Sequence, residues 1–201
     1  MIRYTQAKLI FIDILPQNEG IITMNIAYVY LQIYRLFDKS TPIKSDCGVI
    51  CQKACCKGDD SGMYLFPGEK EVFRLLSPSW AKIEKTDFCY KYSGKEKNVP
   101  LLVCKGSCDR YQRPLACRIF PLTPYINNED KIEVIVDPRA KSLCPLAREL
   151  SVQDFDYQFV KNIKKAFVIL TKNGEIKEYM RKYSEYIDEY RRFWDAKEWS
   201  E

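Results

Sequence analysis

The 201-residue chain contains no histidine and only eight glycines. Without histidine it has no imidazole base, no Cys-His nucleophile and no mixed Cys-His zinc finger. None of the glycines falls in a dinucleotide-binding fingerprint or a P-loop, so the sequence gives no sign of a phosphate cradle. The apolar stretch at residues 21–37 carries Asn25, Gln32 and Arg35, which makes it a poor membrane span. These absences remove the commonest histidine-dependent and nucleotide-dependent enzyme classes.

The N-terminal residues do not predict a secretory signal. An apolar run follows two positive charges, but Asp13 interrupts it and no small-residue cleavage site follows. Hydrophobic residues make up 46% of the chain and charged residues 29%, which is ordinary for a soluble globular protein. We therefore expect the protein to reside in a reducing cytoplasm, and we expect no membrane partner.

What the sequence does contain is nine cysteines in an uneven arrangement. The first group is Cys47, Cys51, Cys55 and Cys56; the second is Cys104, Cys108 and Cys117; Cys144 follows, and Cys89 stands alone between the groups. An odd count excludes complete internal disulfide pairing, and a chain of this length does not need disulfides to fold. The sequence therefore predicts eight soft-metal ligands: Cys47, Cys51, Cys55, Cys56, Cys104, Cys108, Cys117 and Cys144. Cys89 lies in an apolar strand and is interpreted as a buried core thiol.

The spacing within the first group permits two local structures. On a helix, Cys47, Cys51 and Cys55 would share one face. In a loop, the same sulfurs could wrap one ion, with Gly48 supplying backbone freedom. In either case short spacings bring thiolates to one ion at a low cost in loop-closure entropy.

Three arginines, Arg110, Arg113 and Arg118, surround the second group. Cations stabilise thiolates and offset the charge of a bound cluster, and arginine can donate hydrogen bonds to sulfur. We expect Arg113 and Arg118 to support the bound metal in this way. The formal charge is +5 with all thiols neutral; eight thiolates holding two divalent ions would lower it to about +1. The basic balance then offsets the sites and argues against a nucleic-acid partner.

The motif Cys108-x2-Tyr-x-Arg-Pro-x2-Cys117-Arg-x-Phe-Pro, together with the four cysteines of the first group, resembles the YkgJ-type cysteine-cluster proteins. That family is described as a zinc- or iron-chelating domain. The resemblance covers roughly residues 47–144 and implies that Cys47, Cys51, Cys55, Cys56, Cys108 and Cys117 chelate metal. Cys104 and Cys144 are added from their positions alone. The family usually has two residues between its early cysteines and this chain has three, so which early sulfurs share a metal stays open.

The fold class predicted from the residue patterns is α+β. Helical periodicity is found at residues 24–37, 152–170 and 176–199, and a Pro-Gly-Glu turn at residues 67–69 indicates a helix through Leu76. Strands are expected at residues 88–92 and 99–104, paired around a Gly-Lys turn, and at Ile132 to Val136. We divide the chain into a leader and helix (1–46), a cysteine-cluster core (47–150) and a C-terminal helical hairpin packed on that core (151–201).

The function predicted first is metal binding, with iron–sulfur cluster(s) or zinc held by cysteine in two sites or in one polynuclear site. A related cysteine signature in a flagellin lysine methylase, where an iron–sulfur cluster accompanies methyl transfer, implies an alternative. The protein would then be an iron–sulfur-dependent modifying enzyme with a protein substrate or partner. A third alternative is a zinc-ribbon-like nucleic-acid binder. No residue pattern identifies a catalytic group.

Overall fold

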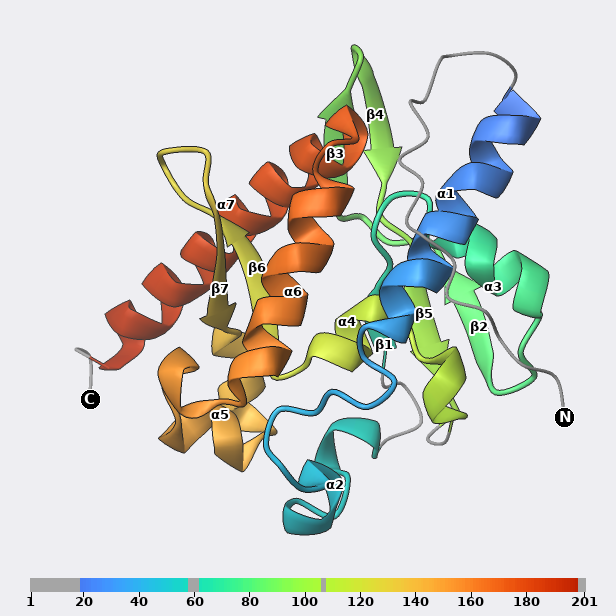
Figure 1. The fold of residues 1–201 in the computed structure, drawn as a ribbon. Coiled ribbons are helices and arrows are strands. Elements are labelled where there is room, and N and C mark those ends of the chain that lie inside the picture. Colours follow the sequence, from blue (N-terminus) through green and yellow to red (C-terminus); the bar gives the residue numbers. More distant parts are fainter. Residues whose placement is uncertain (1–18, 58–61, 106–107, 199–201) are drawn as a thin grey trace, which may run out of the picture.

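The computed structural model describes residues 19–57, 62–105 and 108–198, and Figure 1 shows their arrangement. Most of the expected leader, the pair Asp59 and Asp60, and Trp199 lie outside the described residues, and the side chain of Trp194 is not described. Within the described ranges the chain is an α+β protein, as predicted, with three small antiparallel sheets and helices packed around them.

The central sheet is formed by three short strands in the order β1-β5-β2. These are β1 (Gly62–Tyr64), β5 (Leu101–Cys104) and β2 (Ala81–Glu84). Strand β5 contributes the buried residues Leu102 and Val103 and pairs antiparallel with both neighbours. Strand β5 therefore lies beside β1, the strand that precedes α3, and its last residue is Cys104 of the second cysteine group.

The hairpin predicted between residues 88–92 and 99–104 is wrong in its pairing. The structure pairs β3 (Cys89–Tyr92) with β4 (Lys95–Asn98) through a two-residue turn at Ser93 and Gly94. Both turn residues have positive φ, 49° and 73°, as a type I′ turn requires. This tight turn completes the hairpin locally and leaves β5 to pair with the central sheet.

A second hairpin joins β6 (Leu122–Ile126) to β7 (Ile132–Val136), and the limits of β7 confirm the predicted strand. The helices α6 (Tyr157–Leu170) and α7 (Gly174–Glu198) confirm the two C-terminal periodic segments. Helix α6 contacts β7 and β6, and α7 contacts both β6 and β3, so the pair packs against both β-hairpins.

The remaining helices connect the sheets, and four of the nine cysteines lie in them. They are α1 (Glu19–Arg35), α2 (Cys47–Ile50), η1 (Ala54–Cys56), α3 (Lys70–Leu76), η2 (Arg110–Gln112), α4 (Leu115–Ile119), η3 (Pro138–Ser142), α5 (Pro145–Glu149) and η4 (Val152–Asp154). Helix α3 begins where the Pro-Gly-Glu turn predicts it, and α1 begins before the predicted helical segment.

One hydrophobic cluster joins α1, the sheets and the C-terminal helices. It includes the fully buried side chains of Tyr30, Leu65, Phe159, Phe167 and Tyr179. The ring of Phe66 makes edge contacts with Phe167 and Tyr179 at centroid distances of 4.9 and 5.7 Å. The elements α2 and η1 contain no buried residue, so the first cysteine group lies outside this core.

In the described part of the chain, no helix combines the length and the apolar character that crossing a bilayer requires.

Candidate metal centre

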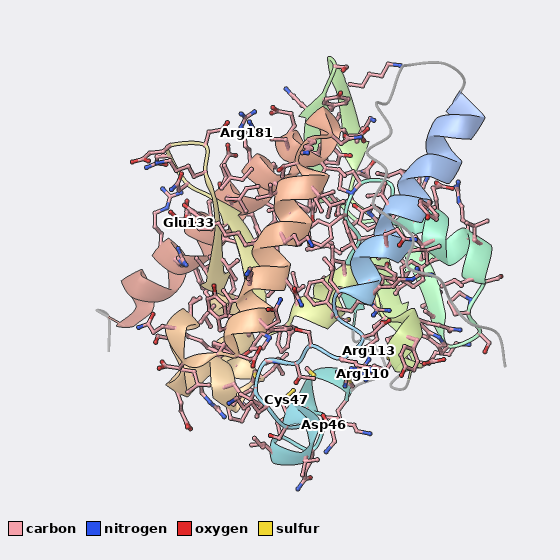
Figure 2. All side chains as sticks on the ribbon, in the orientation of Figure 1. Asp46, Cys47, Arg110, Arg113, Glu133 and Arg181 are labelled. Carbon is pink, nitrogen blue, oxygen red and sulfur yellow. The ribbon has the colours of Figure 1, made fainter. Side chains whose placement is uncertain are left out.

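A cavity of about 340 Å³ lies at the end of the molecule that carries α2. Seven of its lining residues are cysteines: Cys47, Cys51, Cys55, Cys56, Cys108, Cys117 and Cys144. Figure 2 shows Asp46, Cys47, Arg110 and Arg113 gathered at this end, away from Glu133 and Arg181. Residues from three distant stretches of sequence therefore share one space. All seven are free thiols.

The first cysteine group is neither a continuous helix nor an open loop. Asp46 caps α2 by accepting a hydrogen bond from the Gly48 amide at 2.9 Å. The helix ends after one turn because Gln52 and Lys53 take positive φ angles of 51° and 59°. The chain then reverses into η1, which carries Cys55 and Cys56. This break turns the later cysteines back toward the cavity.

The second group is ordered by a cap and a guanidinium. The Asp109 carboxylate accepts a hydrogen bond from the Tyr111 amide at 2.9 Å and starts η2. Arg113 then donates from Nε to the sulfur of Cys108 at 3.3 Å. Cys117 follows on α4 and also lines the cavity. One cationic side chain thus contacts a predicted ligand directly.

Arg118 supports the site through the backbone. Its guanidinium donates to the carbonyl oxygens of Arg113, Tyr34 and Tyr111 at 2.8, 3.3 and 2.6 Å. Its side chain is only 4% exposed and lies over the Tyr34 ring, 4.2 Å from the centroid. The contacts described for Arg118 are with main-chain oxygens, the Tyr34 ring and Asp38, so it fixes the loop that carries Arg113.

Sequence reasoning missed the buried carboxylate of Glu69, which holds α4 in place. Glu69 is completely buried and accepts hydrogen bonds from the Leu115 amide (2.6 Å), the Tyr34 hydroxyl (2.5 Å) and the Phe66 amide (3.0 Å). Leu115 is the first residue of α4, so Glu69 fixes the start of the helix that bears Cys117. The Pro-Gly-Glu turn gave a local signal for a helix start and no signal for these distant partners.

The third stretch of sequence that reaches the cavity contributes Cys144, which is 7% exposed and precedes α5. Its amide donates to the Ala140 carbonyl of η3 at 2.8 Å. The structure thus brings this predicted ligand to the cavity. Cys104 ends β5, paired with Ala81, and is not among the described residues that line the cavity. Cys89 lies in β3 opposite Asn98 and is half-buried, so its thiol is less buried than predicted.

The thiols influence one another's ionisation. Burial, followed by the charges of Cys51, Asp46 and Cys144, raises the pKa of Cys47. Burial and then the charges of Cys108 and Cys56 raise the pKa of Cys117. The sulfurs of Cys55 and Cys56 lie 3.9 Å apart. This contact raises the pKa of Cys55 and, with help from Arg113 and Lys53, lowers that of Cys56 to about 6.

The donor set fits a soft metal, because several thiols face one space that is also lined by cations. Of the residues that the structure describes, the cationic ones lining this space are Lys53, Arg110, Arg113 and Arg118, and the acidic one is Asp46. Among the described residues, no three cysteine or acidic side chains converge closely enough to hold an ion as they stand. Binding therefore requires the sulfurs to move inward, which the unburied α2 and η1 segments can accommodate.

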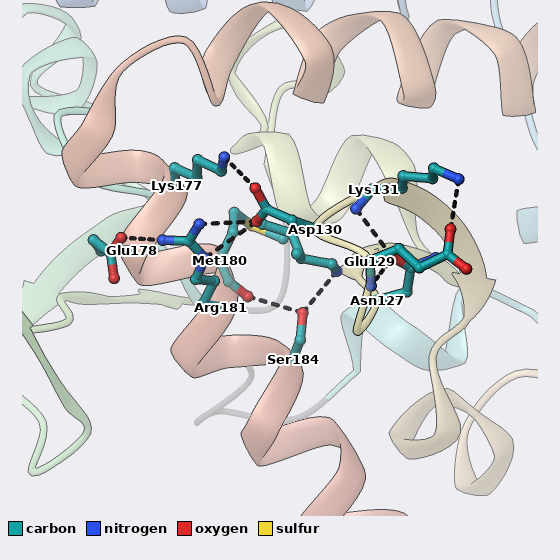
Figure 3. A network of polar contacts seen from close by, with 10 residues as sticks. Asn127, Glu129, Asp130, Lys131, Lys177, Glu178, Met180, Arg181 and Ser184 are labelled. Carbon is teal, nitrogen blue, oxygen red and sulfur yellow. Dashed lines mark hydrogen bonds and ion pairs between the residues drawn. The ribbon is translucent and has the colours of Figure 1, made fainter.

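A second cavity, of about 400 Å³, lies between the tip of the β6–β7 hairpin and α7. Its lining residue Asp130 already has two cationic partners, as Figure 3 shows: Asp130 binds Lys177 at 2.5 Å and Arg181 at 2.9 Å. Ser184 accepts from the Ile126 amide at 2.9 Å and donates to the Met180 carbonyl at 2.8 Å. These contacts tie the hairpin to α7, and we assign this cavity a structural role.

Comparison of the chain with protein-family models, with curated proteins and with solved structures gave no match.

Proposed function

We propose that this protein binds metal, as iron–sulfur cluster(s) or as zinc, through the thiolates that line the cysteine cavity. The observation that supports the proposal most is the gathering of seven cysteines from residues 47–56, 108–117 and 144 at one cavity. The fold therefore brings thiols that are far apart in the sequence into one small space.

The charge of the cavity supports the same proposal. Seven thiolates around an ion or cluster leave a net negative charge, and cations nearby offset it. Among the described residues, four cationic side chains line the cavity beside one acidic side chain, that of Asp46. Arg113 already donates to the sulfur of Cys108. Such hydrogen bonds tune the affinity or the reduction potential of a thiolate site.

We also propose that the chain is related to the YkgJ-type cysteine-cluster proteins, which its cysteine motif resembles, and that it resides in a reducing cytoplasm. Thiolate sites persist where thiols stay reduced, whereas an oxidising compartment favours disulfides. All seven thiols at the cavity are free, and the odd total count agrees with a role other than pairing.

The test is elemental analysis of the full chain purified without oxygen, with visible absorption to separate iron–sulfur from zinc. We expect stoichiometric metal in the wild type, a marked loss in Cys108→Ser, and full retention in Cys89→Ser as the matched control. Near-ultraviolet circular dichroism of each variant reports whether the aromatic core is intact. A well-folded wild type that carries no metal, or one whose cavity cysteines are joined in disulfides, would overturn the proposal.

A further inference from the structure

The cysteine cavity is lined by a serine hydroxyl, that of Ser40, in addition to its thiols. Among the residues that the structure describes, the Oγ of Ser40 is the single buried side-chain nitrogen or oxygen without a hydrogen-bond partner. A buried hydroxyl that makes no hydrogen bond destabilises the folded state, and folded proteins pair nearly all such groups. The Ser40 hydroxyl is therefore free to donate to an acceptor held in the cavity.

The loop that carries Ser40 is anchored on both sides of this residue. Before it, the carboxylate of Asp38 lies 3.5 Å from the guanidinium of Arg118. After it, the carbonyl of Pro42 accepts a hydrogen bond at 2.9 Å from the amide of Asp156, the residue that caps α6. Because both flanks are tied to other elements, the loop holds the Ser40 hydroxyl at the cavity.

The neighbouring threonine shows how a hydroxyl is paired when it serves the loop itself. Thr41 also lines the cavity, but its Oγ1 donates to the carbonyl of Ile43 at 2.6 Å. This contact closes a local turn. The two adjacent hydroxyls therefore differ in role: that of Thr41 stabilises the loop, and that of Ser40 remains available to a bound group.

The acceptors around a metal in this cavity would be sulfur anions. Zinc would be held by cysteine thiolates, and an iron–sulfur cluster would add inorganic sulfide. One donor to sulfur is already present, since Arg113 donates to the sulfur of Cys108 at 3.3 Å. Ser40 differs from Arg113 in being neutral, so its hydroxyl can contribute a hydrogen bond without changing the charge of the site.

We propose that the Ser40 hydroxyl donates a hydrogen bond to a metal-bound sulfur anion in the cavity, a cysteine thiolate or the sulfide of a cluster. This inference rests on the proposed function and adds a residue other than cysteine and arginine to its site. Ser40 is then a positioning residue and not a ligand. Its hydrogen bond withdraws electron density from the sulfur, and such bonds tune the affinity and the reduction potential of thiolate sites.

The experiment compares Ser40→Ala with the wild type in the full chain, metal-free and metal-loaded, under nitrogen. In the metal-free chain the variant should be at least as stable as the wild type in urea unfolding, because an unpaired buried hydroxyl is removed. In the loaded chain the metal affinity should fall by about three- to tenfold, because a hydrogen bond to the sulfur is lost. These opposite signs distinguish a hydroxyl that serves the bound group from one that serves the fold.

Spectroscopy of the loaded protein identifies the acceptor. If the protein contains iron and acid-labile sulfide, Ser40→Ala should lower its reduction potential, since the hydrogen bond favours the more electron-rich reduced cluster. In protein reloaded with Co²⁺, thiolates are the only sulfur anions, and loss of the hydrogen bond should move the sulfur-to-cobalt charge-transfer band to longer wavelength. A shift in the Co²⁺ form assigns the bond to a thiolate, whereas an effect confined to the iron form assigns it to sulfide.

Thr41→Val is the matched control, because the Thr41 hydroxyl is already bonded within the loop. It should lower the stability of the metal-free chain and leave the metal affinity and the spectra unchanged. Wild-type affinity, potential and charge-transfer energy in Ser40→Ala would overturn the inference and leave metal binding intact. A loss of metal-free stability in Ser40→Ala as large as that in Thr41→Val would also overturn it. A wild-type chain that binds no metal would overturn the proposed function as well.

Discussion

The Nε of Arg113 donates a hydrogen bond to the sulfur of Cys108 across 3.3 Å, which couples a guanidinium to one wall of the cysteine cavity. Burial lowers the pKa of Arg113, but the hydrogen bond and the charges of Cys108, Cys56 and Cys117 outweigh it and leave the pKa raised. The guanidinium therefore stays charged, and its charge favours the thiolate form of the sulfurs around it.

Replacing Arg113 by glutamine is expected to weaken metal affinity by about ten- to a hundredfold, because the sulfur loses a charged hydrogen-bond donor. Competition with a chelator of known affinity measures the change. Arg74→Gln is the matched control, since the exposed side chain of Arg74 pairs with Glu71 on α3 and should leave the affinity unchanged. Equal affinities for the wild type and Arg113→Gln would show that the contact plays no part in binding.

Cys56 should be the most reactive thiol of the cavity in the metal-free, reduced protein. The contact with Cys55, aided by Arg113 and Lys53, lowers its pKa to about 6, so most of it is thiolate at pH 7. Burial raises the pKa of Cys117, which should react much more slowly. Peptide mapping after brief iodoacetamide treatment measures the order. Cys55→Ala should slow the labelling of Cys56, and labelling of Cys117 first would contradict the prediction.

Glu69→Gln should lower the free energy of unfolding by about 2–4 kcal/mol, because the new amide group leaves a buried donor without its acceptor. The carboxylate takes hydrogen bonds on both oxygens, from Leu115 and Tyr34 on one and from Phe66 on the other. Urea unfolding measures the loss. The control is Glu84→Gln, an exposed partner of Lys82, for which a change within about 0.5 kcal/mol is expected. A similar small change in both variants would refute a supporting role for Glu69.

The contact between the β6–β7 hairpin and α7 should weaken in acid. Hydrogen bonds from Lys177 and Arg181 lower the pKa of Asp130 below its ordinary value of 3.8. A lowered folded-state pKa stabilises the fold above the unfolded value and loses that contribution as the pH falls through the folded value. The wild type should therefore lose its advantage over Asp130→Asn below about pH 4.

Paired unfolding measurements from pH 6 to 3 check this prediction, with Glu129→Gln as the control on the same hairpin. High salt should shrink the difference, because the ion pairs are exposed. A difference between the wild type and Asp130→Asn that grows as the pH falls would have the wrong sign for a lowered pKa.

The sequence was most informative where structure is decided locally. The β-branched run from Ile132 to Val136 gave a strand with the right limits, and the Pro-Gly-Glu turn correctly placed the start of α3. The pairing of strands was predicted less well. The tight turn at Ser93 and Gly94 closes a hairpin within ten residues, whereas the longer pairing was predicted from two strand-like stretches on either side of a Gly-Lys turn.

The residues of the candidate site show the same contrast between local and long-range signals. Residue type, spacing and the family resemblance together singled out the thiols, and seven of the eight predicted ligands line one cavity. Glu69 escaped notice because its partners, Tyr34 and Leu115, are 35 and 46 residues away and reach it only in the folded chain. Cys104 was included for its distance of four residues from Cys108, but strand pairing with Ala81 decides where it lies.

The absence of buried residues in α2 and η1 has a consequence for how the proposed metal would be acquired. The apolar core can assemble around Phe66, Phe167 and Tyr179 without any help from residues 47–56. Binding of the proposed metal would then be a late step that follows folding of the core. Metal could be delivered, withdrawn or exchanged by a donor thiol at this one outlying segment while the body of the molecule keeps its shape.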